Sequence, residues 1–358
     1  MPKTLVNLSL VFFVAVGVIL AAQNSSAQTT VAVGNCRPPL VSYSTISEAV
    51  AAVTPNSTVL VCPGTYPEQV TITQALKLKG LKDEAGYPVI TVPSGGLVGG
   101  AQLSVPGTDF VSIGPVDIAN LVVDGANSGV DCSTNLLIGI QYNAGFGSLD
   151  NVDVRNQNPG GCGYGIIAGG LGDNLEVNIR NSRIHDFDYI GVFAGAVYAE
   201  FILNLASNWI ASASTTVQAG VSYGFSSEGR ATYNIIEVAG RIGLDAAPYV
   251  GGVIIVADNL VIGSNVGMFL GCCGTTVTRN NLFNNGTGIV LYGEGNVIKS
   301  NAIVQSSTAA IDADCSSPNT VENNIIFGAP IGIANIASGD TVKGNTFYSV
   351  TTLTTTCP

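Results

Sequence analysis

The fold of this chain is decided by a short stretch near its C-terminus, Asn280-Asn281-Leu282-Phe283, followed by Gly288-Ile289-Val290. With Asn281 as the reference position, the equivalents along the chain are Asn120, Val152, Ser182, Asn208, Asn234, Asn259, Asn301, Asn324 and Asn345. An apolar residue stands two places after each of them, and successive copies lie between 20 (281 to 301) and 32 (120 to 152) residues apart. Repeats of this length, with Asn and Gly at fixed offsets, are typical of a stacked solenoid.

One repeat is long enough for three short strands, which we expect at residues 276–278, 282–283 and 288–291. Strands of successive repeats would stack about 4.8 Å apart. Asn at the reference position suits a tight bend because it tolerates left-handed backbone conformations, and stacked amides can bond to one another. The apolar residue two places later would point into the core, and the Gly before the next apolar residue would permit a second corner.

Residues 44–53 predict a short helix near the N-terminus. Ser44 or Thr45 can cap it, and its apolar side chains fall on one face, namely Ile46, Ala49, Val50 and Val53. Because a solenoid exposes its core at each end, an amphipathic helix ahead of the first strand is expected to cover that end.

This helix, the strand 59–61 and the segments 63–72 and 76–80 resemble the start of right-handed parallel β-helices of the pectin-lyase-like superfamily. The later Asn-x-Ile and Gly-Ile repeats are similar to the coil repeats of that family, so the resemblance covers about residues 43 to 350. It implies an all-β, right-handed parallel β-helix of about twelve or thirteen coils with a short N-terminal capping helix. It implies no single activity, because this fold hosts lyases, hydrolases, esterases, epimerases and proteins without activity.

The first 27 residues resemble a secretory signal, with a basic start at Lys3, an apolar run over 5–22 and small residues at Ser25 and Ala27. An uncleaved membrane anchor is the alternative, because the apolar run is nearly long enough to span a bilayer. We divide the chain into a signal peptide (1–27), an N-terminal segment with the capping helix (28–57), the β-helix (58–350) and a C-terminal tail (351–358). The expected location is secreted: extracellular, periplasmic or at the cell surface, with no membrane span after cleavage.

The charge balance restricts the partners. Charged residues make up 10% of the chain, and the net charge is −11. Nucleic acid is therefore not an expected partner, since its phosphates demand a basic surface.

All eight cysteines follow the signal, and an even number suits an exported chain that forms disulfides. Their repeat positions and places near the two ends favour three pairs: Cys132–Cys162, Cys36–Cys62 and Cys315–Cys357. Cys272-Cys273 is either a vicinal disulfide or two residues that pair elsewhere. Two adjacent thiols lack the further ligands that a zinc site needs, so we expect no metal among the site residues and no cofactor, and leave open calcium binding by surface carboxylates.

Because side chains alternate along a strand, several charged residues, the His and the Trp are predicted to lie on one outer face. The positions one and three places after the reference residue carry Asp153, Arg155, Arg183, His185, Trp209 and Glu237, among them the single His and the single Trp. Asp186 follows at the next corner. On a saccharide-binding face Trp209 would stack on a sugar, and Arg155 and Arg183 would pair with carboxylates.

In a polysaccharide-processing enzyme, His185 or Asp186 would serve as the acid/base. The alternative is a solvated face with an Asp153–Arg183 pair, a Trp209 covered by a loop, and a His185 held by Asp186 or Asp188. A second outward row is more often packing beneath loops, and it consists of Phe193, Ser222, Asp245, Phe269, Val290 and Asp312.

The signature segments of the family's enzymes are missing. Uronate epimerases of this fold use Asp-Pro-His-Asp, of which His185-Asp186 matches the second half. We therefore expect a secreted protein that binds or processes extracellular or cell-wall polysaccharide, with uronate-containing chains among the candidates, and leave open whether it is an enzyme. The rival hypothesis is a structural or adhesion solenoid without catalysis or a small-molecule site.

Overall fold

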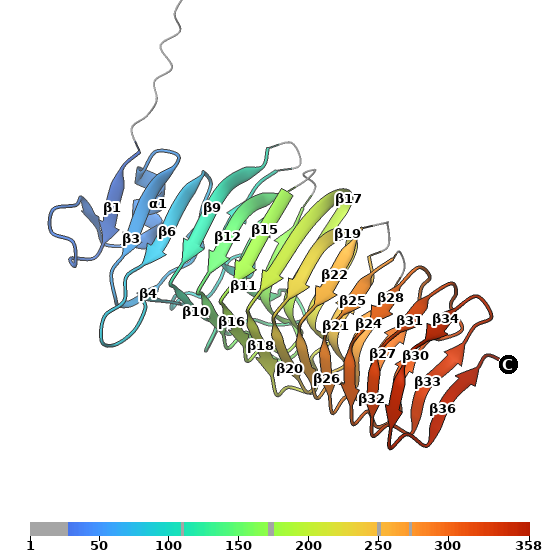
Figure 1. Ribbon diagram of the computed structural model, residues 1–358. Helices are drawn as coiled ribbons and strands as arrows, with labels where there is room; N and C mark the ends of the chain where they lie inside the picture. The colour runs from blue at the N-terminus through green and yellow to red at the C-terminus, as the bar shows by residue number, and fades with distance from the viewer. Residues whose placement is uncertain (1–27, 109–110, 171–174, 249–251, 272–273) are drawn as a thin grey trace, which may run out of the picture.

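The computed structural model describes residues 28–108, 111–170, 175–248, 252–271 and 274–358. The predicted signal segment 1–27 and Cys272-Cys273 lie outside the described residues. The chain winds into a solenoid whose coils stack from β1 and α1 at one end to β36 at the other (Figure 1). The described residues are all-β apart from the helix near the N-terminus, as predicted.

Two long sheets form the walls, and every pairing between their strands is parallel. The smaller sheet contains β4 (Thr65–Pro67), β7 (Val89–Thr91), β10 (Val122–Asp124), β13 (Asp153–Arg155), β16 (Arg183–His185), β18 (Trp209–Ser212), β20 (Ile235–Val238), β23 (Leu260–Ile262), β26 (Asn281–Phe283), β29 (Ala302–Val304), β32 (Ile325–Phe327) and β35 (Thr346–Tyr348).

The larger sheet takes the other strands of each coil. It contains β1 (Thr30–Val33), β2 (Ser42–Tyr43), β3 (Ser57–Val61), β5 (Val70–Thr71), β6 (Leu76–Gly80), β8 (Ala101–Pro106), β9 (Ile113–Ala119), β11 (Leu137–Asn143), β12 (Gly145–Asp150), β14 (Gly163–Gly169), β15 (Leu175–Arg180), β17 (Ile190–Ala206), β19 (Ala219–Thr232), β21 (Ile242–Ala246), β22 (Ile254–Ala257), β24 (Val266–Leu270), β25 (Thr276–Thr278), β27 (Thr287–Leu291), β28 (Val297–Lys299), β30 (Ala309–Asp312), β31 (Thr320–Glu322), β33 (Ile331–Ile336), β34 (Thr341–Lys343) and β36 (Thr352–Thr356).

The coil around β26 shows how the core is built. Its three strands, β25, β26 and β27, match the three predicted segments. Leu282 lies in register with Val261 of the coil before and Ile303 of the coil after, and none of the three is more than 1% exposed. Each buried side chain of this kind stabilises the fold by about 1.5–3 kcal/mol.

The repeat register is wrong at two of its positions. Asn280, rather than Asn281, occupies the position of Asn259 and Asn301, because its Oδ1 accepts hydrogen bonds from the N (2.9 Å) and Nδ2 (2.9 Å) of Asn259. Asn281 is exposed and begins β26. At the N-terminal side Leu121, and not Asn120, matches Val152, since Val122 pairs with Asp153. At Asn281 the reference position was set one residue too late. Leu282 and Phe283 are both apolar, so the alternation of apolar residues does not show which of the two points into the core.

The bend also lies one residue earlier than predicted. The left-handed residues precede the buried amides, as at Ser207 (φ 59°), Asp258 (φ 59°) and Arg279 (φ 55°). The Asn residues at the reference position are instead buried, except for the half-buried Asn345 at the end of the stack, and they form a ladder of side-chain amides. The ladder consists of Asn208, Asn234, Asn259, Asn280, Asn301, Asn324 and Asn345. The predicted amide stacking is therefore confirmed, and the predicted left-handed conformation belongs to the neighbouring residue.

The recurring glycines are needed for space. A Cβ at Gly243 would lie 2.5 Å from Cγ1 of Val261 and 2.6 Å from the carbonyl oxygen of Gly267. The predicted reason, freedom at a corner, is wrong at this position: Gly243 lies within β21, where a side chain would collide with the next coil.

The predicted capping helix is α1 (Ile46–Ala52). Thr45 caps it, its Oγ1 accepting a hydrogen bond from the Glu48 amide at 3.1 Å. The carboxylate of Glu68 accepts bonds from the Ile46 (2.8 Å) and Ser47 (2.9 Å) amides, which satisfies two further donors at the helix N-terminus. Ile46 and Ala49 are fully buried at this end of the solenoid.

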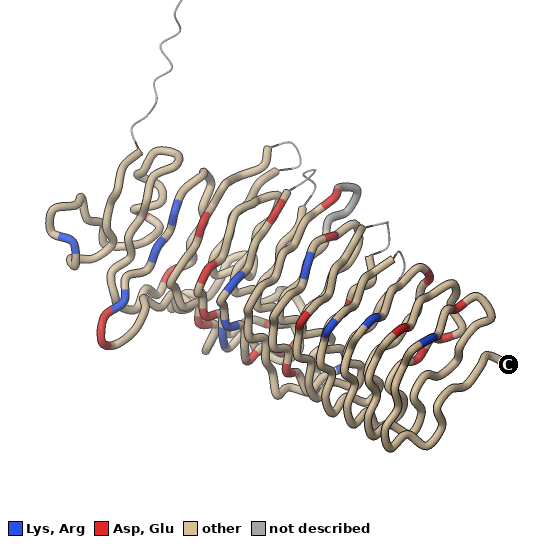
Figure 2. The backbone as a smooth tube through the Cα atoms, viewed as in Figure 1, with Lys and Arg blue, Asp and Glu red and all other residues tan. Residues whose placement is uncertain are grey.

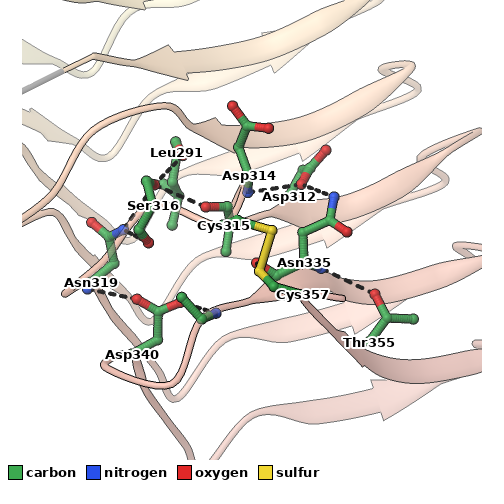
Figure 3. The surroundings of a disulfide bond; sticks show 12 residues. Leu291, Asp312, Asp314, Cys315, Ser316, Asn319, Asn335, Asp340, Thr355 and Cys357 are labelled. Carbon is green, nitrogen blue, oxygen red and sulfur yellow. Dashed lines mark hydrogen bonds between the residues drawn. A yellow bond between two sulfur atoms is a disulfide. The ribbon is translucent and has the colours of Figure 1, made fainter.

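The three predicted disulfides are present: Cys36–Cys62, Cys132–Cys162 and Cys315–Cys357. Figure 3 shows the last of them, beside Asp312, Asn335 and Thr355. Cys357 directly follows β36, which pairs in parallel with β33. The residues described as a tail therefore add one more strand to the stack, which the sequence repeat did not indicate.

Charged residues are scattered along the solenoid, with acidic and basic positions often in adjacent coils (Figure 2). Arg279 and Asp258 form one such pair, at 2.7 Å, and Glu322 bridges Lys299 and Lys343 at 3.2 and 3.3 Å. These pairs are exposed on their basic side and contribute little to stability.

Candidate functional site

The predicted face exists on the outside of the smaller sheet. Asp153 of β13 lies in register with Arg183 of β16, which lies in register with Trp209 of β18. In the parallel row, Arg155 lies beside His185, and Ala211 lies between His185 and Glu237 of β20. The structure therefore brings the predicted side chains onto one face, in the predicted order.

His185 is held by two carboxylates. Its Nε2 lies 2.9 Å from Oδ1 of Asp153, and its Nδ1 lies 2.6 Å from Oδ2 of Asp186. The hydrogen bond with Asp153, followed by that with Asp186, raises the pKa of His185 above its ordinary value, although partial burial opposes the shift. The arrangement favours an imidazolium that donates from both ring nitrogens.

The guanidinium of Arg155 is also paired with carboxylates. Its Nε donates to Oδ2 of Asp124 at 2.9 Å, and its Nη1 lies 3.8 Å from Asp153. Asp124 also accepts bonds from Asn156 and Ala126; these bonds and Arg155 lower the pKa of its carboxyl, against the effect of burial. Asp124 is a residue of this face that sequence reasoning missed. It stands at the end of β10, and the one-residue register error at Asn120 hid its alignment with Arg155.

Arg183 and Trp209 form the aromatic part of the face. The Arg183 guanidinium carbon lies 4.8 Å from the centroid of the Trp209 ring, and the His185 ring lies 5.4 Å from it. Trp209 is half-buried and Arg183 is exposed. In the part of the chain that the structure describes, Arg183 makes no ion pair, so the alternative Asp153–Arg183 pair is not formed.

A groove of about 420 Å³ lies beside Trp209, on the side toward the C-terminus. Four of the predicted residues line it: His185, Asp186, Trp209 and Glu237. Its other walls come from Ala211, Ser212, Ala213, Val238, Ala239, Ile262 and Gly263. Asp153, Arg155 and Arg183 lie on the same face but outside the lining of this groove.

Asp188 has a structural task. Its carboxylate accepts hydrogen bonds from the amides of Gly160 (2.6 Å), Gly161 (2.7 Å) and Gly163 (2.7 Å), and the side chain is buried. It fixes the turn of the preceding coil and does not hold His185. Of the two carboxylates that the alternative interpretation offered for His185, Asp186 is the partner.

The geometry restricts the chemistry of His185. Both ring nitrogens already face carboxylates, so proton exchange with a bound molecule would require Asp153 or Asp186 to move away. Asp186 is the more exposed of the two, with 54% of its side chain accessible against 21% for Asp153. No group of three or more His, Cys, Asp or Glu side chains in the described ranges is arranged to hold a metal ion.

Comparison with known proteins bears on the fold. The family described as the right-handed β-helix region matches residues 266–354. The structure is similar to the A-module of the mannuronan C-5 epimerase AlgE4 of Azotobacter vinelandii, with a TM-score of 0.63 and 17% identity, over 86% of this chain and 90% of that one. The fold is the right-handed parallel β-helix. This is the fold that the sequence resemblance implied.

Two further structures have the same architecture. The Dettilon tailspike protein is similar with a TM-score of 0.60 and 15% identity, over 82% of this chain and 62% of that one. A lacto-N-biosidase from Eubacterium ramulus is similar with a TM-score of 0.57 and 10% identity, over 89% of this chain and 68% of that one. Compared by sequence with curated proteins, the chain has no match. Likeness at this level of identity concerns the fold alone.

Two findings bear on the compartment in which the protein folds and on its relation to a membrane. The described part of the chain contains no helix long and apolar enough to cross a bilayer. Its three disulfides are typical of proteins that fold in an oxidising compartment.

Proposed function

We propose that this protein is secreted and binds a polysaccharide chain in the groove beside Trp209. The observation that carries the proposal is the position of the indole ring, which is half-buried, lines the groove and is held in place by Arg183 and His185. A rigid aromatic ring offers an apolar surface to the C–H face of a sugar at little cost in conformational entropy. Glu237 and Asp186, in the same groove, can accept hydrogen bonds from sugar hydroxyls.

The finer proposal is a polysaccharide that contains uronate units. Arg183 is the cation that remains available on this face, because Arg155 is bound to Asp124 and Asp153. Its guanidinium can form a bidentate pair with a carboxylate while it stays stacked on Trp209. A sugar over Trp209 would place a neighbouring carboxylate near Arg183.

Binding without catalysis is the form of the function that the geometry supports best. A general acid or base needs a nitrogen that can reach the substrate, and both nitrogens of His185 are bonded to carboxylates. In this arrangement Asp153 and Asp186 hold the His185 ring, which lies beside Trp209. Two of the similar structures, by their names an epimerase of mannuronan and a lacto-N-biosidase, act on glycans, which supports the class of ligand.

A structural or adhesion role is the second candidate, and a different region favours it. Farther along the smaller sheet the outer face is apolar, with Phe283 39%, Ile325 51%, Phe327 44% and Tyr348 53% exposed. Exposed apolar side chains gathered in this way are typical of protein contacts. This role would need no glycan.

Calorimetric titration with hexasaccharides of mannuronate, guluronate and galacturonate tests the proposal. We expect at least one of them to bind, Trp209→Ala to weaken it at least about tenfold, and Arg183→Gln to weaken it by a similar factor. Phe283→Ala is the matched control, since it removes an exposed aromatic ring from the same face of the same sheet, and it should leave binding unchanged. Absence of binding, or equal loss in the control, would remove the proposal and favour the structural role.

A further inference from the structure

The outer face of the smaller sheet is uncharged over its last four strands, β26, β29, β32 and β35, of which β26 and β32 lie along the lower edge of the stack in Figure 1. In each of them the first and third side chains point outward and the middle one points into the core, as the alternating exposure shows. We call this surface the C-terminal face. Its outward residues are Asn281, Phe283, Ala302, Val304, Ile325, Phe327, Thr346 and Tyr348.

Short turns leave the C-terminal face open to solvent. The chain leaves the four strands through residues 284–286, 305–308, 328–330 and 349–351. Each of these turns has three or four residues, leads directly into the next strand of the coil and is too short to fold back over the sheet. Among the described residues no longer loop lies at these corners, so the large apolar side chains of the face stay exposed.

An exposed apolar surface of this extent is typical of a protein contact. The four strands span three spacings of about 4.8 Å, or about 14 Å, and large apolar side chains project from three of them. The charges narrow the choice of partner, because a basic protein would be held by carboxylates and this face has none. The partner must therefore present an apolar face of its own.

A second copy of the chain presents such a face, and the sizes of the side chains match when two copies meet. A twofold axis along the strands, midway between β29 and β32, sets the two stacks antiparallel and places β29 of one copy over β32 of the other. Ala302 then faces Ile325, and Val304 faces Phe327. β29 is the recessed strand of the face, since its two outward side chains are small and only partly exposed, whereas both outward side chains of β32 are exposed. The projecting strand of each copy fits the recess of the other.

The outer strands of the face match under the same axis. β26 of one copy lies over β35 of the other, so Phe283 faces Tyr348 and Asn281 faces Thr346. The first pair brings two aromatic rings together, and the second allows a hydrogen bond between an amide and a hydroxyl. The strands follow one spacing in both copies, so the contacts stay in step along the face.

Other positions of the axis fit less well. An axis through β29 would set Ala302 and Val304 against their counterparts and leave a gap at the centre. An axis through β32 would bring the two Phe327 rings to the same point. An axis between β26 and β29 would place Glu237 of β20 under β35 of the other copy, where its carboxylate would be buried.

We propose that the C-terminal face is the contact of a twofold-symmetric dimer of this chain, with the two solenoids antiparallel. Copies of an acidic chain with a net charge of −11 repel each other, and this contact lies where neither copy carries charge. A standard protein contact covers about 800 Å² on each partner, and a face of four short strands falls at or below that size. The dimer is therefore reversible, with a dissociation constant on the order of micromolar.

The dimer leaves the groove beside Trp209 uncovered. β18 and β20, which carry Trp209 and Glu237, are separated from the contact by β23. Dimerisation therefore does not rest on glycan binding, and Trp209→Ala should dimerise as the unaltered protein does.

Sedimentation velocity of the chain without its predicted signal segment, from about 1 to about 300 µM, tests the proposal. We expect dimers at the upper end of this range. Ile325→Asp should raise the dissociation constant at least about a hundredfold, because twofold symmetry places the new carboxylate in the contact twice. Ile325 is exposed in the single chain, so the variant should fold, which urea denaturation checks. Ile235→Asp is the matched control, since Ile235 is an exposed isoleucine on β20 of the same sheet but outside the face, and it should dimerise unchanged.

Introduced cysteines test the position of the axis. Asn281 and Thr346 lie three strand spacings apart within one chain, about 14 Å, but face each other across the proposed contact. A mixture of Asn281→Cys and Thr346→Cys should therefore form a disulfide-linked dimer on mild oxidation, whereas neither variant should do so alone. The unaltered protein, oxidised in the same way, controls for the native cysteines.

Three outcomes would overturn the proposal. One is an unaltered chain that stays monomeric at every concentration, which would leave the face to a different partner. Another is that Ile325→Asp dimerises as tightly as the unaltered protein. The third is that Ile235→Asp abolishes the dimer or that the cysteine mixture does not link, either of which would place the contact elsewhere. Hexasaccharide binding measured on the same samples reports separately on the proposed function.

Discussion

The middle coils and the C-terminal coils of this solenoid share one scaffold but differ in what they display. From Asn259 to Asn345 the ladder amides follow one another at 21 or 23 residues, and each bonds to the next. Between Val152 and Asn259 the steps are 25, 26, 26 and 30 residues, and the ladder ends in a hydroxyl at Ser182. The inward apolar residues are fully buried in both regions, except for the half-buried Phe347 in the last coil.

The outer faces carry the difference. The C-terminal coils expose Phe283, Ile325 and Phe327, whereas the middle coils place Asp153, His185 and Trp209 on the same sheet. An outward position is free to change because the core does not depend on it. In this fold, chemistry therefore varies on the outside of a constant interior, and the longer coils are where it gathers.

The largest expected effect on stability comes from breaking the amide ladder of the C-terminal coils. Asn280→Ala removes an acceptor for the N and Nδ2 of Asn259 and a donor to Val256 O and to Asn301 Oδ1. Buried groups left without partners cost about 1–3 kcal/mol each, so we expect a loss of about 3 kcal/mol or more in the free energy of unfolding, measured by urea denaturation.

Two variants sharpen that result. Asn281→Ala alters the adjacent but exposed side chain and should change stability by less than about 0.5 kcal/mol. Ser182→Ala removes one hydroxyl from the middle coils and should cost about 1–2 kcal/mol. If Asn280→Ala and Asn281→Ala had equal effects, the ladder would not hold the C-terminal coils together.

A substitution in the middle coils should stabilise the protein. Burial raises the pKa of Asp245 to about 6 in the folded state, whereas it is near 3.9 in the unfolded chain, so the folded state holds more protons between these values. Stability contributed by this group therefore falls as the pH rises from about 4 to about 6. Asp245→Asn should gain about 1–3 kcal/mol at pH 8 and little at pH 4, as seen in urea denaturation at both pH values. A loss at pH 8 would contradict the burial of an ionised group.

The smallest effect concerns His185. Its pKa is raised in the folded state, first by Asp153 and then by Asp186, so the stability it contributes is fully present below about pH 6.5 and is lost as the pH rises through the raised value. His185→Gln should lower the melting temperature at pH 6 and have less effect at pH 9. A penalty equal at both pH values would show that the charge of His185 does not matter.

The fold was largely predictable because the residues that specify it recur at regular intervals in the sequence. The strands and the capping helix follow from spacing and composition, which left the cap open between Ser44 and Thr45. The positions of the cysteines favoured the three disulfides that the structure contains. The register failed at Asn120 and Asn281, where two neighbouring residues satisfy the same pattern and only packing decides between them. The strand at 352–356 carries no Asn or Gly signal, and its pairing with β33 is set by the stack.

The site was predictable in position but not in its connections. Alternation placed Arg183, His185 and Trp209 on one face, because register in a parallel stack is a matter of counting. Which carboxylate pairs with each cation depends on the exact side-chain geometry, which residue counting does not give. The Asp153–His185 contact and the Asp124–Arg155 pair are such cases, and so is the buried Oδ1 of Asp245, which has no hydrogen-bond partner among the described residues.

Trp209 is the single tryptophan of the chain, so its fluorescence reports directly on the groove beside it. We propose that a uronate-containing glycan binds in this groove, in the middle coils. Titration with the hexasaccharide that binds best should shift the tryptophan emission in a saturable way, with the dissociation constant found by calorimetry, in the unaltered protein and in Phe283→Ala alike. Calorimetric binding without a change in tryptophan emission would contradict the account.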